Sequence, residues 1–172
     1  MRRVCAWCSA TLIEDGEEAV PISHGICEPC AGRMLSETRA SVREFLEGLV
    51  APVFLVDGGG RIHAANGGAR ALVGKSNADI EDRLGGDVIE CANARLPGGC
   101  GKTVHCQACT IRNSVTETLA TGTPRLNVPA TQDVYTDRGV AQKRFLVSTE
   151  RAGSMVLLRV EEDHAANLIT EV

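Results

Sequence analysis

The sequence predicts an α+β protein with a five-stranded antiparallel sheet and flanking helices, preceded by a small metal-stapled module and a linking helix. Two observations predict this architecture. Extended apolar segments occur as a pair near the middle of the chain and as a group of three near its end, with helical segments between them. Eight cysteines form two groups of four, and the first group lies in a segment too poor in apolar residues to fold without a staple.

Residues 1–32 are predicted to form the metal-stapled module. Their cysteines read C-x2-C, eighteen residues, C-x2-C, which is the spacing of a zinc ribbon in which a hairpin brings two CxxC turns together. The acidic residues 14–18 are expected at the solvated tip of that hairpin. The predicted zinc ligands are Cys5, Cys8, Cys27 and Cys30. Four thiolates leave no open coordination position, so the sequence predicts a structural site.

Residues 33–50 are predicted to form an amphipathic linking helix. Apolar or small residues recur at steps of three and four, and charged residues occupy the flanks of this stripe. The stripe consists of Leu35, Thr38, Val42, Phe45 and Leu49. It predicts a homodimer contact through residues 33–49. The alternative is an ordinary helix that packs on its own chain, since two heptads do not prove a coiled coil.

Residues 51–163 are predicted to form the larger domain, and residues 164–172 a tail. Strands at 53–57 and 61–65, joined by three glycines, predict a hairpin. Asn66 is then expected to cap a short helix that Gly74 ends.

The rest of this domain is predicted as one helix and three strands. The helix runs over 110–120, begins at Cys109 and stops at Gly122. The strands are expected at 125–134, 142–150 and 154–160. They complete a five-stranded sheet whose strand order the pattern does not fix.

These residues resemble the opening of a PAS sensory domain. The resemblance covers roughly residues 45–162 and is carried by Ala51 to Asp57, Gly60-Arg61-Ile62, Ala65-Asn66, Ala69 and Leu72-Val73-Gly74. It implies a sheet and helices that enclose a small-molecule or cofactor cavity, with the helix at 33–49 in the place of a signalling helix. Residues 1–32 are similar to ribbons that precede sensor modules in bacterial signalling proteins.

The chain departs from most of that family between Asp87 and Cys109, where the second cysteine quartet is inserted. An ordinary member has plain helices lining its pocket there. The departure puts haem, flavin or a simple metabolite in doubt as the ligand. It makes the chain similar to the minority of PAS domains that hold an iron-sulfur cluster.

The second quartet, C-x8-C-x5-C-x2-C, matches no symmetrical ribbon. Its members are Cys91, Cys100, Cys106 and Cys109. Pro97 and the glycines around Cys100 give a backbone able to wrap a body larger than one ion. His105 and Arg112 would place positive charge beside an anionic centre. An iron-sulfur cluster is the favoured occupant, and a structural Zn²⁺ is the rival, since zinc also accepts four thiolates.

Composition excludes several function classes. The net charge of −4, with both signs interspersed, disfavours nucleic acid and anionic membranes as partners. No segment approaches the apolar length of a membrane span, and no secretory leader opens the chain, so a disulfide framework is disfavoured and a cytoplasmic location is expected. No nucleophile, base and orienting carboxylate can be assigned together, so we expect no enzyme.

The sequence therefore predicts a cytoplasmic sensor module of bacterial type. It would bind a metal centre through the second quartet and relay redox or gas state to another signalling protein. One alternative is a structural interaction adaptor with two zinc ions. A further alternative is a small electron-transfer protein.

Overall fold

The fold was analysed in a computed structural model that describes residues 2–6, 8–14 and 22–163. The chain divides into two compact units, residues 1–44 and 45–172. Apart from Glu14, the predicted acidic tip lies outside the described residues, as does the predicted tail at 164–172.

The first unit contains a three-stranded sheet in the order β2-β1-β3. Its strands are β1 (Arg2–Cys5), β2 (Thr11–Glu14) and β3 (Ile22–Gly25). β1 pairs antiparallel with β2 and parallel with β3, and Cys5 stands opposite Gly25. Because parallel strands end at the same edge of a sheet, this pairing places the CxxC turn after β1 beside the one that follows β3.

The helix α1 runs from Glu28 to Glu47, so it begins five residues before the predicted start at Arg33. The prediction relied on the apolar stripe, which does not extend into the first turn. That turn is set by capping instead, because the Cys27 carbonyl accepts a hydrogen bond from the Ala31 amide at 2.9 Å. Pro29 lies in the first turn, where its missing N–H removes no hydrogen bond from the helix. The second CxxC motif therefore straddles the helix N-terminus.

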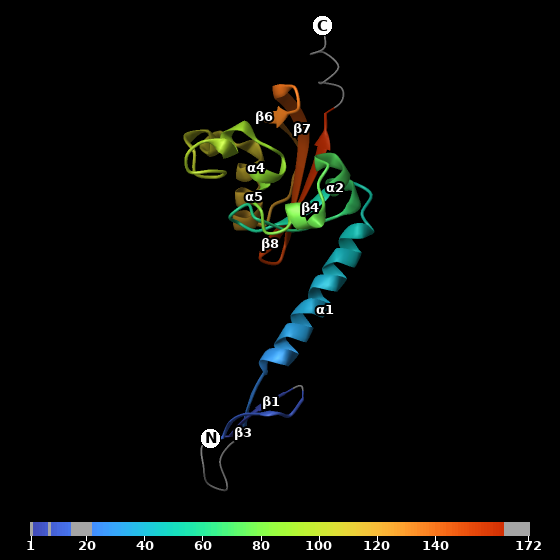
Figure 1. The fold of residues 1–172 in the computed structure, drawn as a ribbon, viewed down its shortest axis with the longest axis vertical. Coiled ribbons are helices and arrows are strands. Elements are labelled where there is room, and N and C mark those ends of the chain that lie inside the picture. The colour runs from blue at the N-terminus through green and yellow to red at the C-terminus, as the bar shows by residue number, and fades with distance from the viewer. Residues whose placement is uncertain (1, 7, 15–21, 164–172) are drawn as a thin grey trace. The chain divides into compact units, whose positions relative to one another are not determined.

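The second unit is built on the five-stranded antiparallel sheet that the sequence predicts (Figure 1). Its strands are β4 (Val53–Val56), β5 (Ile62–Ala65), β6 (Arg125–Thr136), β7 (Gly139–Ala152) and β8 (Met155–Glu162). Their order is β5-β4-β8-β7-β6, and every neighbouring pair is antiparallel. The first strand therefore pairs with the last, which the sequence pattern did not reveal.

The helices of this unit lie between β5 and β6 in the chain. They are α2 (Gly67–Val73), α3 (Asn77–Ile80), α4 (Gly85–Val88), η1 (Ala92–Arg95), η2 (Val104–Ala108) and α5 (Thr110–Thr121). The longest of them, α5, packs on β6, β7 and β8 and contributes Val115 to the core. Its predicted stop is confirmed, since Gly122 adopts a φ of 75°. None of the helices in the described residues is long and apolar enough to cross a membrane.

Asn66 joins three segments of this unit. Its side chain is fully buried, and its Oδ1 accepts from the Ala69 amide at 2.9 Å, which confirms the predicted cap of α2. The same oxygen accepts from the Val53 amide at 3.0 Å. Its Nδ2 donates to the carbonyls of Leu49 and Ala51 at 2.9 and 2.8 Å. One amide side chain thus fastens the segment that follows α1 to both β4 and α2.

We expect Asn66→Ala to lower the free energy of unfolding of the second unit by about 3–4 kcal/mol, because it removes a helix cap and strands buried donors and acceptors. Urea denaturation followed by circular dichroism measures the change. The control is Asn113→Ala on the exposed face of α5, which should cost less than about 1 kcal/mol. Equal losses in the two variants would contradict the assigned role of Asn66.

Candidate metal centres

The first quartet forms a compact group of sulfur atoms. The Sγ atoms of its four cysteines all lie within 4.8 Å of one another. Cys8 and Cys27 approach to 3.7 Å, and the Cys27 amide donates to Cys5 Sγ at 3.4 Å. A zinc ion sits about 2.3 Å from each sulfur, so the sulfurs of a tetrahedral zinc site are about 3.8 Å apart. The quartet of Cys5, Cys8, Cys27 and Cys30 could therefore hold one tetrahedral metal ion with little movement.

The thiols of this group affect one another's acidity. The pKa of Cys30 is raised to about 12, first by a hydrogen bond with Cys27, then by burial and by the thiols of Cys8 and Cys5. None of the eight cysteines, all of which lie among the described residues, forms a disulfide. Because a metal takes thiolates, its uptake at this quartet must release protons.

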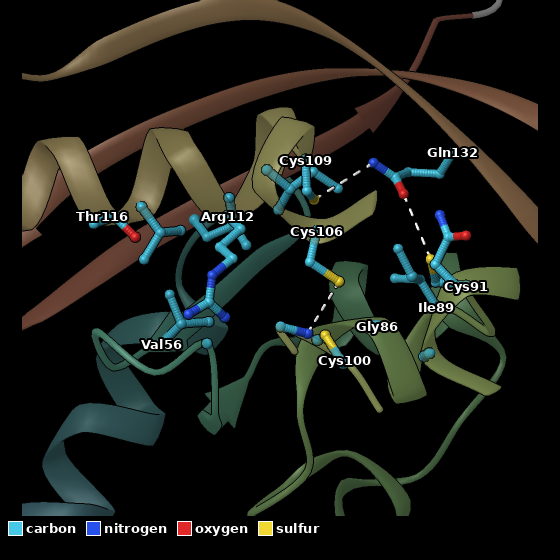
Figure 2. A pocket seen from close by; sticks show the side chains of 18 of the residues that line it. Val56, Gly86, Ile89, Cys91, Cys100, Cys106, Cys109, Arg112, Thr116 and Gln132 are labelled. Atoms are coloured by element: carbon cyan, nitrogen blue, oxygen red, sulfur yellow. Dashed lines mark hydrogen bonds between the residues drawn. The ribbon is translucent and has the colours of Figure 1, made fainter. Parts of the chain in front are cut away.

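The second quartet lines a cavity of about 170 Å³ in the second unit (Figure 2). The floor of this cavity is formed by apolar core side chains, among them Val56, Ile62, Val115, Leu158 and Val160. The thiols of Cys91, Cys100, Cys106 and Cys109 all contribute to its lining. Since a single water needs only about 10–15 Å³ of such space, the cavity is far larger than one ion requires.

Separate local structures bring these cysteines to the cavity, with Cys100 on the loop between η1 and η2. Cys91 precedes η1 and pairs with Val134 of β6 in an isolated bridge, next to a 2.8 Å bond from the Tyr135 amide to the Glu90 carbonyl. Cys106 lies within η2. Cys109 is the N-cap residue of α5, which confirms that this helix begins at the last cysteine.

The pKa values of Cys106 and Cys100 are shifted in opposite directions. Burial alone would raise the pKa of Cys106, but hydrogen bonds from the Thr103 hydroxyl and the Gly101 amide, each at 3.2 Å, together with the Arg112 charge, lower it below its usual value. The pKa of Cys100 is raised, mainly by burial. Cys106 is therefore the thiol best prepared to act as an anionic ligand.

Two glycines allow the close packing around these sulfurs. A Cβ at Gly86 would lie 2.7 Å from Cys100 Sγ, so only glycine lets that thiol rest on the α4 backbone. Gly101 has a φ of 84°, and a Cβ there would collide with the Arg112 guanidinium. The loop that carries Cys100 can therefore wrap tightly against α5.

Arg112 and His105, the two residues predicted to lie beside this centre, both line the cavity. Arg112 extends from α5 so that its guanidinium contacts Gly101, and its charge acts on Cys106. His105 lies on η2 with an exposed side chain at the cavity lining. Their effect on a bound centre stays a prediction.

Sequence reasoning missed Gln132 on β6. This residue is 8% exposed and contacts two of the thiols. A signal was present, because Ala130, Gln132 and Val134 occupy the inward phase of an alternating strand, and a polar residue at such a position needs a buried partner. Thr103, which lies three residues before Cys106, was also missed.

The two quartets differ in geometry. In the described parts of the chain, only the first forms a group of three or more ligand atoms lying within 4.8 Å of one another. The four cysteines of the second quartet line a cavity instead of converging on one position.

Comparisons with known proteins place the fold of the second unit. No protein-family model and no curated protein sequence matches the chain. Among solved structures, it is similar to the RsLOV d2 variant, at 14% identity over 74% of this chain and 68% of that chain, with a TM-score of 0.51. It is also similar to the PAS domain of Bordetella pertussis BvgS, at 14% identity over 77% and 93% of the two chains, with a TM-score of 0.49.

The PAS domain of an HTR-like protein from Haloarcula marismortui is a third similar structure, at 14% identity over 77% of this chain and 97% of that one, with a TM-score of 0.44. The five-stranded antiparallel sheet with its flanking helices is the PAS fold that the sequence resemblance implied. At these identities the likeness concerns the fold alone.

Proposed function

We propose that this PAS-fold chain is a non-enzymatic sensor whose second quartet holds an iron-sulfur cluster, and whose first quartet holds a structural zinc ion. The observation that carries the proposal is the cavity of about 170 Å³ that all four cysteines of the second quartet line. A bound cluster would supply a centre that responds to electrons or to small gases.

The protein's own groups suit an anionic centre. The Gly101 amide and the Thr103 hydroxyl already point at Cys106 Sγ, and Arg112 adds positive charge beside it. Apolar side chains from the core form part of the cavity lining. Such donors and such burial are the means by which proteins stabilise cluster thiolates and set reduction potentials.

A contact route leads from the thiols to the end of α1. The segment holding Cys91 is bonded to β6, and β6 connects through β7 and β8 to β4. Asn66 ties β4 and α2 to the Leu49 carbonyl. Glu47, near the end of α1, accepts from the Gly67 amide at 3.0 Å and from Arg70 at 2.5 Å. A change at the cavity can therefore bias how α1 ends.

The output is proposed to pass to another signalling protein through α1, with homodimerisation along residues 33–49. Phe45 of the predicted stripe is 59% exposed, whereas its neighbour Leu46 is 1% exposed. The end of the helix therefore uses Leu46 to pack within the second unit and leaves Phe45 for a partner surface.

Anaerobic purification followed by metal analysis and visible spectroscopy tests the proposal. We expect about one zinc per chain together with iron and acid-labile sulfide, and a visible absorption that dithionite bleaches. Two zinc ions per chain without visible absorption would overturn the sensing proposal and establish the two-zinc adaptor.

Hydrogen exchange separates a sensor from an electron carrier. A sensor should show different protection of residues 87–112 and of the α1 end between the oxidised and reduced forms. A reversible couple with identical exchange in both forms would identify an electron-transfer protein instead.

A further inference from the structure

We infer that Gln132 is a positioning residue that bridges Cys91 and Cys109 and sets the reduction potential of the centre that they help to hold. This inference rests on the proposed function for its effect on a cluster. The bridge itself belongs to the protein and can be tested without any metal.

The bridge spans two thiols that are distant in the sequence. Cys91 Sγ donates to Gln132 Oε1 at 3.6 Å, and Gln132 Nε2 donates to Cys109 Sγ at 3.7 Å. Figure 2 shows the amide lying between the two cysteines, with a dashed line to each sulfur. Gln132 comes from the sheet, whereas Cys91 precedes η1 and Cys109 caps α5.

Within the described part of the chain, the hydrogen-bond partners of the Gln132 amide are these two thiols. Gln132 is 8% exposed, and burying a glutamine side chain without hydrogen-bond partners costs free energy. The two thiols supply these partners at an inward-facing position of the strand. Reversing the amide exchanges the two roles but still leaves one N–H on one sulfur.

When the cysteines act as thiolate ligands, Cys91 has no proton to donate to Gln132 Oε1, so the part of the bridge that remains is the N–H donor to Cys109 Sγ. An N–H donor stabilises sulfur more strongly as negative charge accumulates on it, so it favours the reduced state of an anionic centre. Removing that donor should therefore lower the reduction potential. The backbone bridge between Cys91 and Val134 is independent of this side chain, so the loop stays attached to β6.

Infrared spectroscopy of the metal-free, reduced full-length chain tests the bridge. The S–H stretch of Cys91, identified as the band that Cys91→Ser removes, should lie at lower frequency in the wild type than in Gln132→Leu. The matched control is Gln142→Leu on β7, where the amide lies 3.5 Å from Asp133 Oδ1 on the exposed side. An unchanged Cys91 band in Gln132→Leu would overturn the inference.

Redox titration of the anaerobically purified chain tests the consequence. Gln132→Leu should keep the iron content of the wild type and shift the reduction equilibrium about tenfold toward the oxidised form, which is about 59 mV lower for a one-electron step. Gln132→Glu should lower the potential further, and Gln142→Leu should leave it unchanged. Equal potentials in wild type and Gln132→Leu would overturn the role in tuning.

The two proposals fail separately. If the wild type contains no iron, the proposed function is wrong, and the infrared bands still decide whether Gln132 bridges the thiols. If the wild type is loaded and the Cys91 band does not respond to Gln132→Leu, the bridge is wrong and the proposed function stands.

Discussion

Replacing Cys106 by Ser is expected to abolish iron binding and visible absorption while leaving the zinc content at one ion per chain. Serine is nearly the same size, but its hydroxyl is not a thiolate at neutral pH, so the centre loses the ligand that the Thr103 hydroxyl, the Gly101 amide and Arg112 are arranged to stabilise. Metal analysis and the visible spectrum of the anaerobically purified variant measure the loss.

A control on the same loop keeps this prediction specific. Gln107→Ala changes an exposed side chain within η2, next to Cys106, without touching a thiol, and should keep wild-type iron. Circular dichroism should show a folded second unit in both variants, because Cys106 lies at the cavity and is not among the core residues that unite the sheet with α5. Full iron content in Cys106→Ser would remove this thiol from the proposed ligand set.

Replacing Cys8 by Ser has the reciprocal expected result: the zinc is lost, the iron centre is retained, and the sheet of β1, β2 and β3 loses its structure. Structural zinc contributes an apparent ~10–16 kcal/mol to the folding of small modules, which far exceeds what so few apolar residues can supply. Hydrogen exchange should show unprotected amides in β1 and at the start of α1. Residues 53–163 should keep their protection, because their core lies entirely within the second unit.

The same region can be examined without mutation. A zinc chelator added to the wild type should reproduce the loss of protection at β1, and added Zn²⁺ should restore it. Ser9→Ala, a change just outside the CxxC turn, serves as the matched variant and should bind zinc normally. Persistence of β1 protection in zinc-free protein would show that the first unit folds without its metal.

Local sequence patterns predicted the helices and strands of the second unit well, because residues with strong conformational preferences stand at the ends of these elements. Asn66 and Gly74 bound α2, and Cys109 and Gly122 bound α5, at the positions that their capping chemistry requires. Extended runs of residues predicted β6 and β8, and the alternation of Phe145 and Val147 within such a run predicted β7. The predicted start of α1 was wrong because the apolar stripe begins later than the capped first turn of the helix.

The two candidate sites also differ in how much of each could be predicted from the sequence. The spacing of Cys5, Cys8, Cys27 and Cys30 was sufficient to predict a compact quartet, because two CxxC turns close on one point with little help from the rest of the chain. The second quartet was recognised as a group from its spacing. Neither its cavity nor Gln132 followed from spacing, since both depend on how β6 packs beside the segment from Cys91 to Cys109.

The sequence by itself determined the five strands, α2 and α5 of the second unit, the two cysteine quartets and the capping residues, because each of these depends on neighbours within a few positions along the chain. Only the tertiary structure decided the strand order, the cavity and the partners of its thiols. Pairing of β4 with β8 and approach of Gln132 to Cys91 join residues from 41 to more than 100 positions apart. Such contacts are selected by the packing of the whole core, which no local pattern encodes.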